Sequence, residues 1–144
     1  MTTTKNISLE GIDPGELYGA QNSYLRLIEE HFKARITGRG QNLIIEGDKA
    51  EAERIDSLFQ SLIRLISQGN RLSQDDIRLA LEMLEKDSRR LAEDLQIVAS
   101  TPKAVVKPRT MGQHVYVRSL DKNDVLFAIG PAGTGKTFLA VAMA

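Results

Sequence analysis

The sequence contains no cysteine, which excludes disulfide bridges and thiolate metal sites. It has no apolar run long enough to span a membrane. Its N-terminal stretch MTTTKNISLEG also lacks the apolar core of a signal peptide. We therefore expect a soluble, cytoplasmic protein with no membrane partner.

The sequence also has no excess of one charge, because 19 Lys and Arg residues balance 19 Asp and Glu residues. The two parts of the chain nevertheless differ in net charge. Residues 1–100 hold 13 basic and 17 acidic side chains, a net charge of −4, whereas residues 101–144 hold 6 and 2, a net charge of +4. A basic C-terminal region suits a phosphate ligand. The chain of 144 residues, 42% of them hydrophobic, has room for one ordinary globular domain or two small ones.

The first part of the chain shows two different apolar patterns. Alternating apolar and polar residues predict a strand over residues 6–12. A helical apolar face follows over residues 16–32, and Gly19 and Asn22 interrupt it. We therefore expect a strand followed by a helical region that is broken in two.

A hairpin is predicted over residues 34–47, with its turn at Gly38-Arg39-Gly40. Asp48 is a suitable N-cap for the next helix, and Glu51 would complete a capping box. Gly69 can end that helix in a left-handed conformation. The resulting order, β-α-β-β-α, predicts an α+β layer in which helices cover a small antiparallel sheet.

Ser73 and Asp76 predict the start of a separate helix. The highly charged residues 85–101 either extend this helix or form a connector. Prolines favour an extended stretch after it. The pattern then predicts an extended segment, a short helix and an apolar strand, at residues 101–113, 113–120 and 123–129.

The stretch GPAGTGKT fits the phosphate-loop pattern G-x-x-x-x-G-K-[ST] without a mismatch. Its glycines let backbone N–H groups point at the β-phosphate of a nucleotide. Lys136 would bring a positive charge to the β- and γ-phosphates, and the Thr137 hydroxyl would bind Mg²⁺. The helix that starts near Gly135 would direct its positive end at the same anion. The predicted nucleotide-binding residues of this loop are Gly130, Pro131, Ala132, Gly133, Thr134, Gly135, Lys136, Thr137 and Phe138.

A working ATPase also needs an acidic residue that holds Mg²⁺ and a group that positions the attacking water. Seven residues follow Thr137, and none of them is acidic. We therefore expect that these 144 residues do not hydrolyse ATP, and that they are the front end of a longer protein. A glycine-rich turn that binds nothing is the alternative interpretation of the motif.

The stretches GPAGTGKTFLAVAMA, PRTMGQHVYVRSLDKNDVLFAIG and EEHFKARITGRGQNLIIEG together resemble the N-terminal part of PhoH-like proteins. These are bacterial cytoplasmic ATPases with a helicase-like core. The resemblance implies ATP and Mg²⁺ as ligands, a role in RNA metabolism beside a YbeY-type endoribonuclease, and a parent protein that forms oligomers. It also implies that Gln113 reads the adenine edge, a task that suits an amide. Tyr116 would either stack on a base or pack in the core.

The N-terminal block also resembles a KH domain, an RNA-binding module in which a G-x-x-G loop clamps a nucleotide backbone. The corresponding stretch here is Gly19-Ala20-Gln21-Asn22, which lacks the last glycine and has no Lys or Arg between. The basic residues near the hairpin, Lys33, Arg35 and Arg39, are the candidate RNA contacts.

These patterns predict an α+β protein in three parts. They are a KH-like domain at residues 1–70, a helical connector at 71–101, and the first βα unit of a P-loop domain at 102–144. Two functions fit this organisation. One is part of a PhoH-like ATPase, and the other is a non-enzymatic KH-like module that binds RNA or protein.

Overall fold

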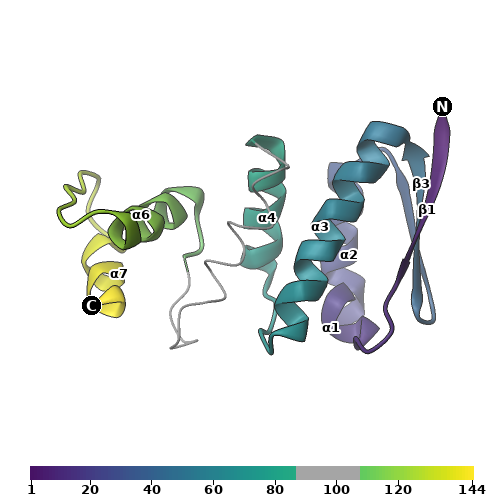
Figure 1. Ribbon diagram of the computed structural model, residues 1–144, viewed down its shortest axis with the longest axis horizontal. Coiled ribbons are helices and arrows are strands. Elements are labelled where there is room, and N and C mark those ends of the chain that lie inside the picture. The colour runs from purple at the N-terminus through teal and green to yellow at the C-terminus, as the bar shows by residue number, and fades with distance from the viewer. Residues whose placement is uncertain (87–107) are drawn as a thin grey trace.

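The computed structural model describes residues 1–86 and 108–144, and within them it has an α+β arrangement (Figure 1). Most of the predicted stretches 85–101 and 101–113 lie outside these residues. No helix in the described part is long and apolar enough to cross a bilayer. The elements are, in chain order, β1 (Thr2–Ser8), α1 (Pro14–Tyr18), the 3₁₀ helix η1 (Ala20–Asn22), α2 (Ser23–His31), β2 (Arg35–Arg39), β3 (Asn42–Asp48), α3 (Lys49–Ser67), α4 (Gln74–Lys86), α6 (Met111–Lys122) and α7 (Lys136–Met143).

The sheet is three-stranded and antiparallel, in the order β1-β3-β2. The hairpin between β2 and β3 is confirmed, but its turn lies later than predicted. Arg39 pairs with Asn42, so the turn residues are Gly40 and Gln41. Gly38 belongs to β2, and a Cβ atom there would lie 2.7 Å from the Tyr18 hydroxyl oxygen. Close packing, and not a turn, therefore requires this glycine.

Strand β1 (Thr2–Ser8) begins and ends earlier than the strand predicted at residues 6–12, and the two ranges overlap only at residues 6–8. The structure pairs Thr2–Ser8 with β3. The three threonines at its start carry no apolar alternation, but β-branched side chains suit a strand. After the strand the chain turns, and the Ile12 N–H donates to the Leu9 carbonyl (3.0 Å). Gly11 adopts a φ of +80° in this turn.

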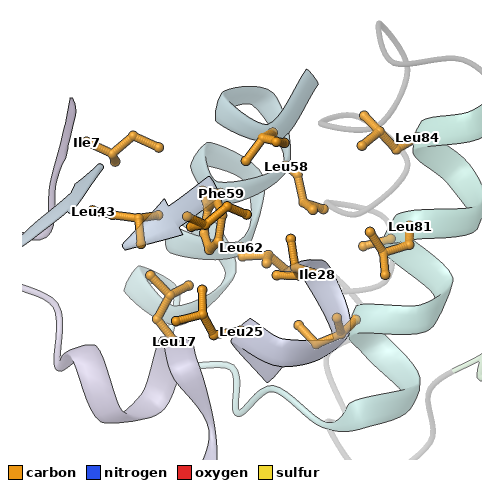
Figure 2. Packing of buried hydrophobic residues seen from close by; sticks show 14 of the residues in the cluster. Ile7, Leu17, Leu25, Ile28, Leu43, Leu58, Phe59, Leu62, Leu81 and Leu84 are labelled. Carbon is orange, nitrogen blue, oxygen red and sulfur yellow. The ribbon is translucent and has the colours of Figure 1, made fainter. Parts of the chain in front are cut away.

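One face of the sheet forms the core together with the helices (Figure 2). Strand alternation directs Ile7, Leu43 and Ile45 toward the helices, where all three are buried. Phe59 of α3 is fully buried at the centre. Each large apolar side chain removed from water contributes roughly 1.5–3 kcal/mol. Figure 1 shows helices on one side of the sheet, and no described element covers the other side.

Helix α4 packs on α2 and α3 and joins the same hydrophobic cluster (Figure 1). Two polar contacts reinforce this packing. The Tyr24 hydroxyl donates to the Leu72 carbonyl (2.9 Å), and His31 Nε2 lies 3.1 Å from a Glu85 carboxylate oxygen. The buried side chains of α4 include Ile77, Leu79, Ala80, Leu81 and Leu84.

Helix α3 begins and ends at the predicted residues, but its capping differs. The Asp48 carboxylate accepts from the Ala50 N–H (3.1 Å), as an N-cap should. Glu51 does not complete the box, because its carboxylate accepts from the Lys33 N–H instead (2.9 Å). Gly69 follows the helix at a φ of +82°.

Helix α4 has the reciprocal capping box that α3 lacks. The Asp76 N–H donates to the Ser73 hydroxyl oxygen (3.3 Å), and the Ser73 N–H donates to the Asp76 carboxylate (2.8 Å). The Ser73 hydroxyl also donates to that carboxylate (2.7 Å). The predicted helix start is thus confirmed in atomic detail.

In the C-terminal part, α6 contains the predicted short helix and extends it at both ends. The strand predicted at residues 123–129 is wrong. This segment has no strand conformation, and Val125, Phe127 and Ile129 are 74%, 89% and 98% exposed. A strand needs a neighbour to satisfy its backbone groups, and the described residues offer none beside it.

Candidate phosphate-binding site

The loop between residues 130 and 135 leads directly into α7, as the motif predicts. Gly133 and Gly135 have φ angles of +78° and +86°, which glycine adopts without strain. Gly135 is the N-cap of α7 and has no side chain to cap the helix. The first N–H groups of α7 therefore remain available to an anion.

The Lys136 side chain folds back over this loop. Its ammonium group donates to the Gly130 carbonyl (2.9 Å), the Pro131 carbonyl (2.7 Å) and the Thr134 hydroxyl oxygen (3.3 Å). The Thr134 hydroxyl in turn donates to the Pro131 carbonyl (3.0 Å). An ammonium has three donors, so the loop satisfies all of them. The positive charge of Lys136 is therefore held against the loop oxygens.

Gln113 lies far from the loop in sequence but contacts it in space. Its side-chain Nε2 donates to the Thr134 carbonyl (3.1 Å), and its Oε1 accepts from the Arg109 N–H (2.8 Å). Its own backbone N–H donates to the Thr110 hydroxyl oxygen at the start of α6 (3.2 Å). An amide has two N–H donors and two lone pairs on oxygen. Gln113 therefore keeps one donor and one lone pair for a ligand.

A pocket of about 450 Å³ opens between α6, the segment before the loop, and α7. Thr110, Gln113 and Tyr116 line it from α6 and its N-cap. Leu126, Phe127 and Ile129 add an apolar wall, and Lys136 contributes a positive charge. No carboxylate belongs to the described lining. The pocket thus combines an apolar and aromatic wall with a cationic end.

The structure brings some of the predicted nucleotide-binding residues together and leaves others apart. Thr137 and Phe138 are exposed and do not line the pocket. The pocket residues from the prediction are Gln113, Gly130, Pro131, Thr134 and Lys136.

Tyr116 and Phe127 also line the pocket. For Tyr116 the sequence left stacking on a base and packing in the core open, and its place three positions after Gln113 puts both on one face of a helix. Phe127 was not among the predicted site residues, because its segment was predicted to be a strand.

Two of the candidate RNA contacts, Arg35 and Arg39, lie apart from the predicted clamp. Gly19–Asn22 separates α1 from α2, and Gln21 and Asn22 adopt left-handed conformations with φ of 53° and 60°. Ile36 points into the helical layer, so alternation directs Arg35 and Arg39 to the opposite, open face of the sheet. The loop lies on the helical side. The two arginines and the loop therefore do not share a surface.

The hydroxyl group of Tyr18 is unusual among the polar groups of the N-terminal part. Its hydroxyl is buried and has no hydrogen-bond partner among the described residues. Burial raises the pKa of this hydroxyl above its ordinary value. The ring covers Gly38 of β2, and Gly19 follows directly in the chain.

The described residues contain no group of His, Cys, Asp and Glu side chains arranged to hold a metal ion.

Comparison with known proteins identifies related sequences. A family model described as PhoH-like protein matches residues 105–144. A PhoH-like protein of Bacillus subtilis (strain 168) is 37% identical over 131 residues, which cover 89% of this chain and 41% of that protein. PhoH-like proteins of Synechocystis and Mycobacterium tuberculosis are 33% and 32% identical, over 89% of this chain and 40% and 37% of theirs. The chain thus spans about 40% of the length of these relatives. No solved structure matches.

Proposed function

Because the chain is related to the PhoH-like proteins over most of its length, we propose that it binds ATP with Mg²⁺ at residues 130–137, as the N-terminal part of an ATPase of that kind. The observation that carries this proposal is the pocket beside the phosphate-loop motif, which both Gln113 and Lys136 line. The relationship extends the proposal to RNA metabolism in the cytoplasm, beside a YbeY-type endoribonuclease and in an oligomeric parent protein.

The groups of the pocket suit the parts of a nucleotide. The free donor and lone pair of Gln113 match the adjacent acceptor and donor on adenine. Tyr116 and Phe127 offer aromatic surface to the base. Lys136 and the N–H groups at the start of α7 would bind the phosphates, with Lys136 exchanging its loop oxygens for phosphate oxygens. The Thr137 hydroxyl would complete the site as a ligand of Mg²⁺.

Binding and hydrolysis are separate parts of the proposal. The described pocket lining contains no carboxylate to hold the metal or to position a water molecule. We therefore expect these 144 residues to bind MgATP without turning it over. Turnover by the purified chain that Lys136→Ala abolishes would contradict this expectation.

The binding test compares MgATP affinity of the wild type and Lys136→Ala by titration calorimetry. Hydrogen bonds to charged groups contribute about 1.5–3 kcal/mol, so we expect about a 10- to 150-fold loss of affinity. Lys122→Ala is a matched control, because Lys122 is an exposed lysine of α6 outside the pocket lining. Equal affinity of wild type and Lys136→Ala would contradict the proposal that this loop binds the phosphates.

A KH-like N-terminal domain is the second proposal. The order β-α-β-β-α and the helix break at Gly19–Asn22 support it. Binding of single-stranded RNA would depend on Arg39, with Lys33 and Arg35 nearby in sequence. Titrating RNA at two salt concentrations tests this, with Arg64→Ala on α3 as the control for Arg39→Ala. Absence of binding at low salt would leave protein contact as the function of this domain.

A further inference from the structure

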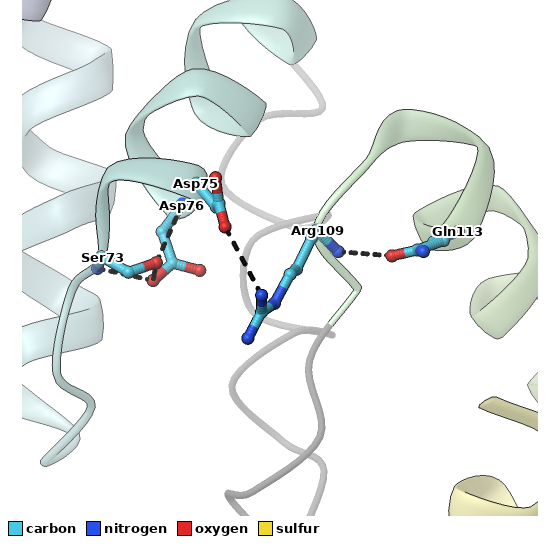
Figure 3. A network of polar contacts seen from close by, with 5 residues as sticks. All are labelled: Ser73, Asp75, Asp76, Arg109 and Gln113. Atoms are coloured by element: carbon cyan, nitrogen blue, oxygen red, sulfur yellow. Dashed lines mark hydrogen bonds and ion pairs between the residues drawn. The ribbon is translucent and has the colours of Figure 1, made fainter. Parts of the chain in front are cut away.

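The stretch from Arg109 to Gln113 touches both the N-terminal domain and the phosphate loop. Met111 packs against the hydrophobic cluster of the N-terminal part. Arg109 Nη1 lies 3.9 Å from the Asp75 carboxylate near the start of α4 (Figure 3). Gln113 then bonds the loop at the Thr134 carbonyl. A few residues thus join two regions that are far apart in the sequence.

The contacts of this stretch determine how the Gln113 side chain is oriented. The Arg109 N–H can only meet an acceptor, so it selects Oε1 of Gln113 (Figure 3). Nε2 must then face the other way, toward the Thr134 carbonyl. Arg109 supplies both the N–H for Gln113 and the guanidinium for Asp75, so a single residue connects the contact with α4 to the orientation of Gln113.

We propose that Asp75, Arg109 and Met111 are positioning residues for the nucleotide site. By docking the start of α6 on α4, they hold Gln113 where it bonds the phosphate loop. Nucleotide affinity then depends on the contact between the start of α6 and α4, and by linkage a bound nucleotide changes the strength of that contact. This inference rests on the proposed nucleotide site.

Charge exchange between the two partners tests the inference in the whole chain. Asp75→Arg and Arg109→Asp should each weaken MgATP binding by about two- to fivefold, the range expected for an exposed ion pair. The double variant, with the charges exchanged, should regain most of the affinity. Arg109→Asp keeps the backbone N–H that bonds Gln113, so the effect isolates the ion pair. Glu82→Arg makes the same charge change two turns further along α4, where Glu82 pairs with Lys86 (3.5 Å), and should leave the affinity unchanged.

Met111→Ala tests the apolar half of the contact and should weaken MgATP binding by about three- to tenfold, because burial of a methionine is partly lost. Met143→Ala is the matched control, since Met143 at the end of α7 neither lines the pocket nor packs against the hydrophobic cluster of the N-terminal part. Wild-type affinity in Asp75→Arg, Arg109→Asp and Met111→Ala would overturn the inference without contradicting the proposed nucleotide site.

A second readout needs no nucleotide. The side-chain amide signals of Gln113 in a ¹H–¹⁵N NMR spectrum should move in Asp75→Arg and return in the exchanged double variant. A merely structural role of Asp75 in α4 would not produce that return. Unmoved Gln113 signals would also overturn the inference. Failure of the wild type to bind MgATP, in contrast, would remove the proposed function and this inference together.

Discussion

The Tyr18 hydroxyl is surrounded by protein but bonds to none of the described residues. A buried hydroxyl that has lost its water costs about 1–3 kcal/mol. Its position against Gly38 explains why the β2 strand has no side chain at this point, since a Cβ atom would lie 2.7 Å from the hydroxyl oxygen. The tyrosine therefore fills space at the expense of an unsatisfied polar group.

We expect Tyr18→Phe to raise the free energy of unfolding by about 1 kcal/mol, because it removes the unpaired hydroxyl and keeps the ring. Urea unfolding of both proteins measures the difference. A loss of stability instead would show that the hydroxyl bonds a water molecule in solution.

The pH dependence gives a second signature of the same residue. Burial raises the pKa of Tyr18 in the fold above its unfolded value, which is about 10. The wild type should therefore lose stability as the pH rises above about 10, because the unfolded chain releases the proton first. Tyr18→Phe lacks this loss, so the stability gap between the two proteins should widen with pH.

Two helix starts were predicted from similar patterns, and only one of them carries a reciprocal capping box. Ser73 and Asp76 cap α4 reciprocally, whereas Glu51 of α3 bonds the Lys33 N–H. Lys33 is close to Glu51 only because the β2–β3 hairpin returns the chain to the start of α3. Local sequence therefore identified both helix starts correctly. The partner of Glu51 depended on tertiary structure, which no local pattern contains.

Helix α6 could likewise be predicted from its own residues, whereas the conformation of the segment that follows it depends on distant parts of the chain. The helix was recognisable from its own residues, and Thr110 caps it. An apolar run becomes a strand only when another strand pairs with it, and residues 123–129 have no such neighbour in the described chain. The contact of Gln113 with Thr134 was likewise beyond any local pattern. Only the resemblance to a family pointed to Gln113.

Removing the α4 cap should destabilise the N-terminal part. Ser73→Ala eliminates the hydroxyl that accepts from the Asp76 N–H and donates to its carboxylate. We expect a loss of about 1 kcal/mol in the free energy of unfolding, measured by urea titration. Glu51→Ala is the matched comparison and should cost less, because the Lys33 N–H that it frees is exposed to water. An equal loss in both variants would contradict the reciprocal box.

Taken as a whole, the described chain divides its apolar side chains unevenly. The N-terminal part buries its apolar residues around one sheet face, while the C-terminal part leaves large apolar side chains in water. Exposed apolar patches of this kind favour contact with other protein surfaces. The exposed residues near the phosphate loop and α7 are Val125, Phe127, Ile129, Phe138 and Val141.

We therefore expect the purified 144-residue chain to self-associate through this region. Sedimentation velocity over a range of concentrations should show a rising mean mass for the wild type. Phe138→Ser combined with Ile129→Ser should reduce that rise, because the two side chains are 65% and 98% exposed and contribute little to the packed core. The thermal stability of this double variant should match that of the wild type for the same reason. A constant monomer mass for the wild type at all concentrations would contradict this expectation. It would show that these side chains stay in contact with water, so that the apolar wall of the pocket remains accessible to a nucleotide base.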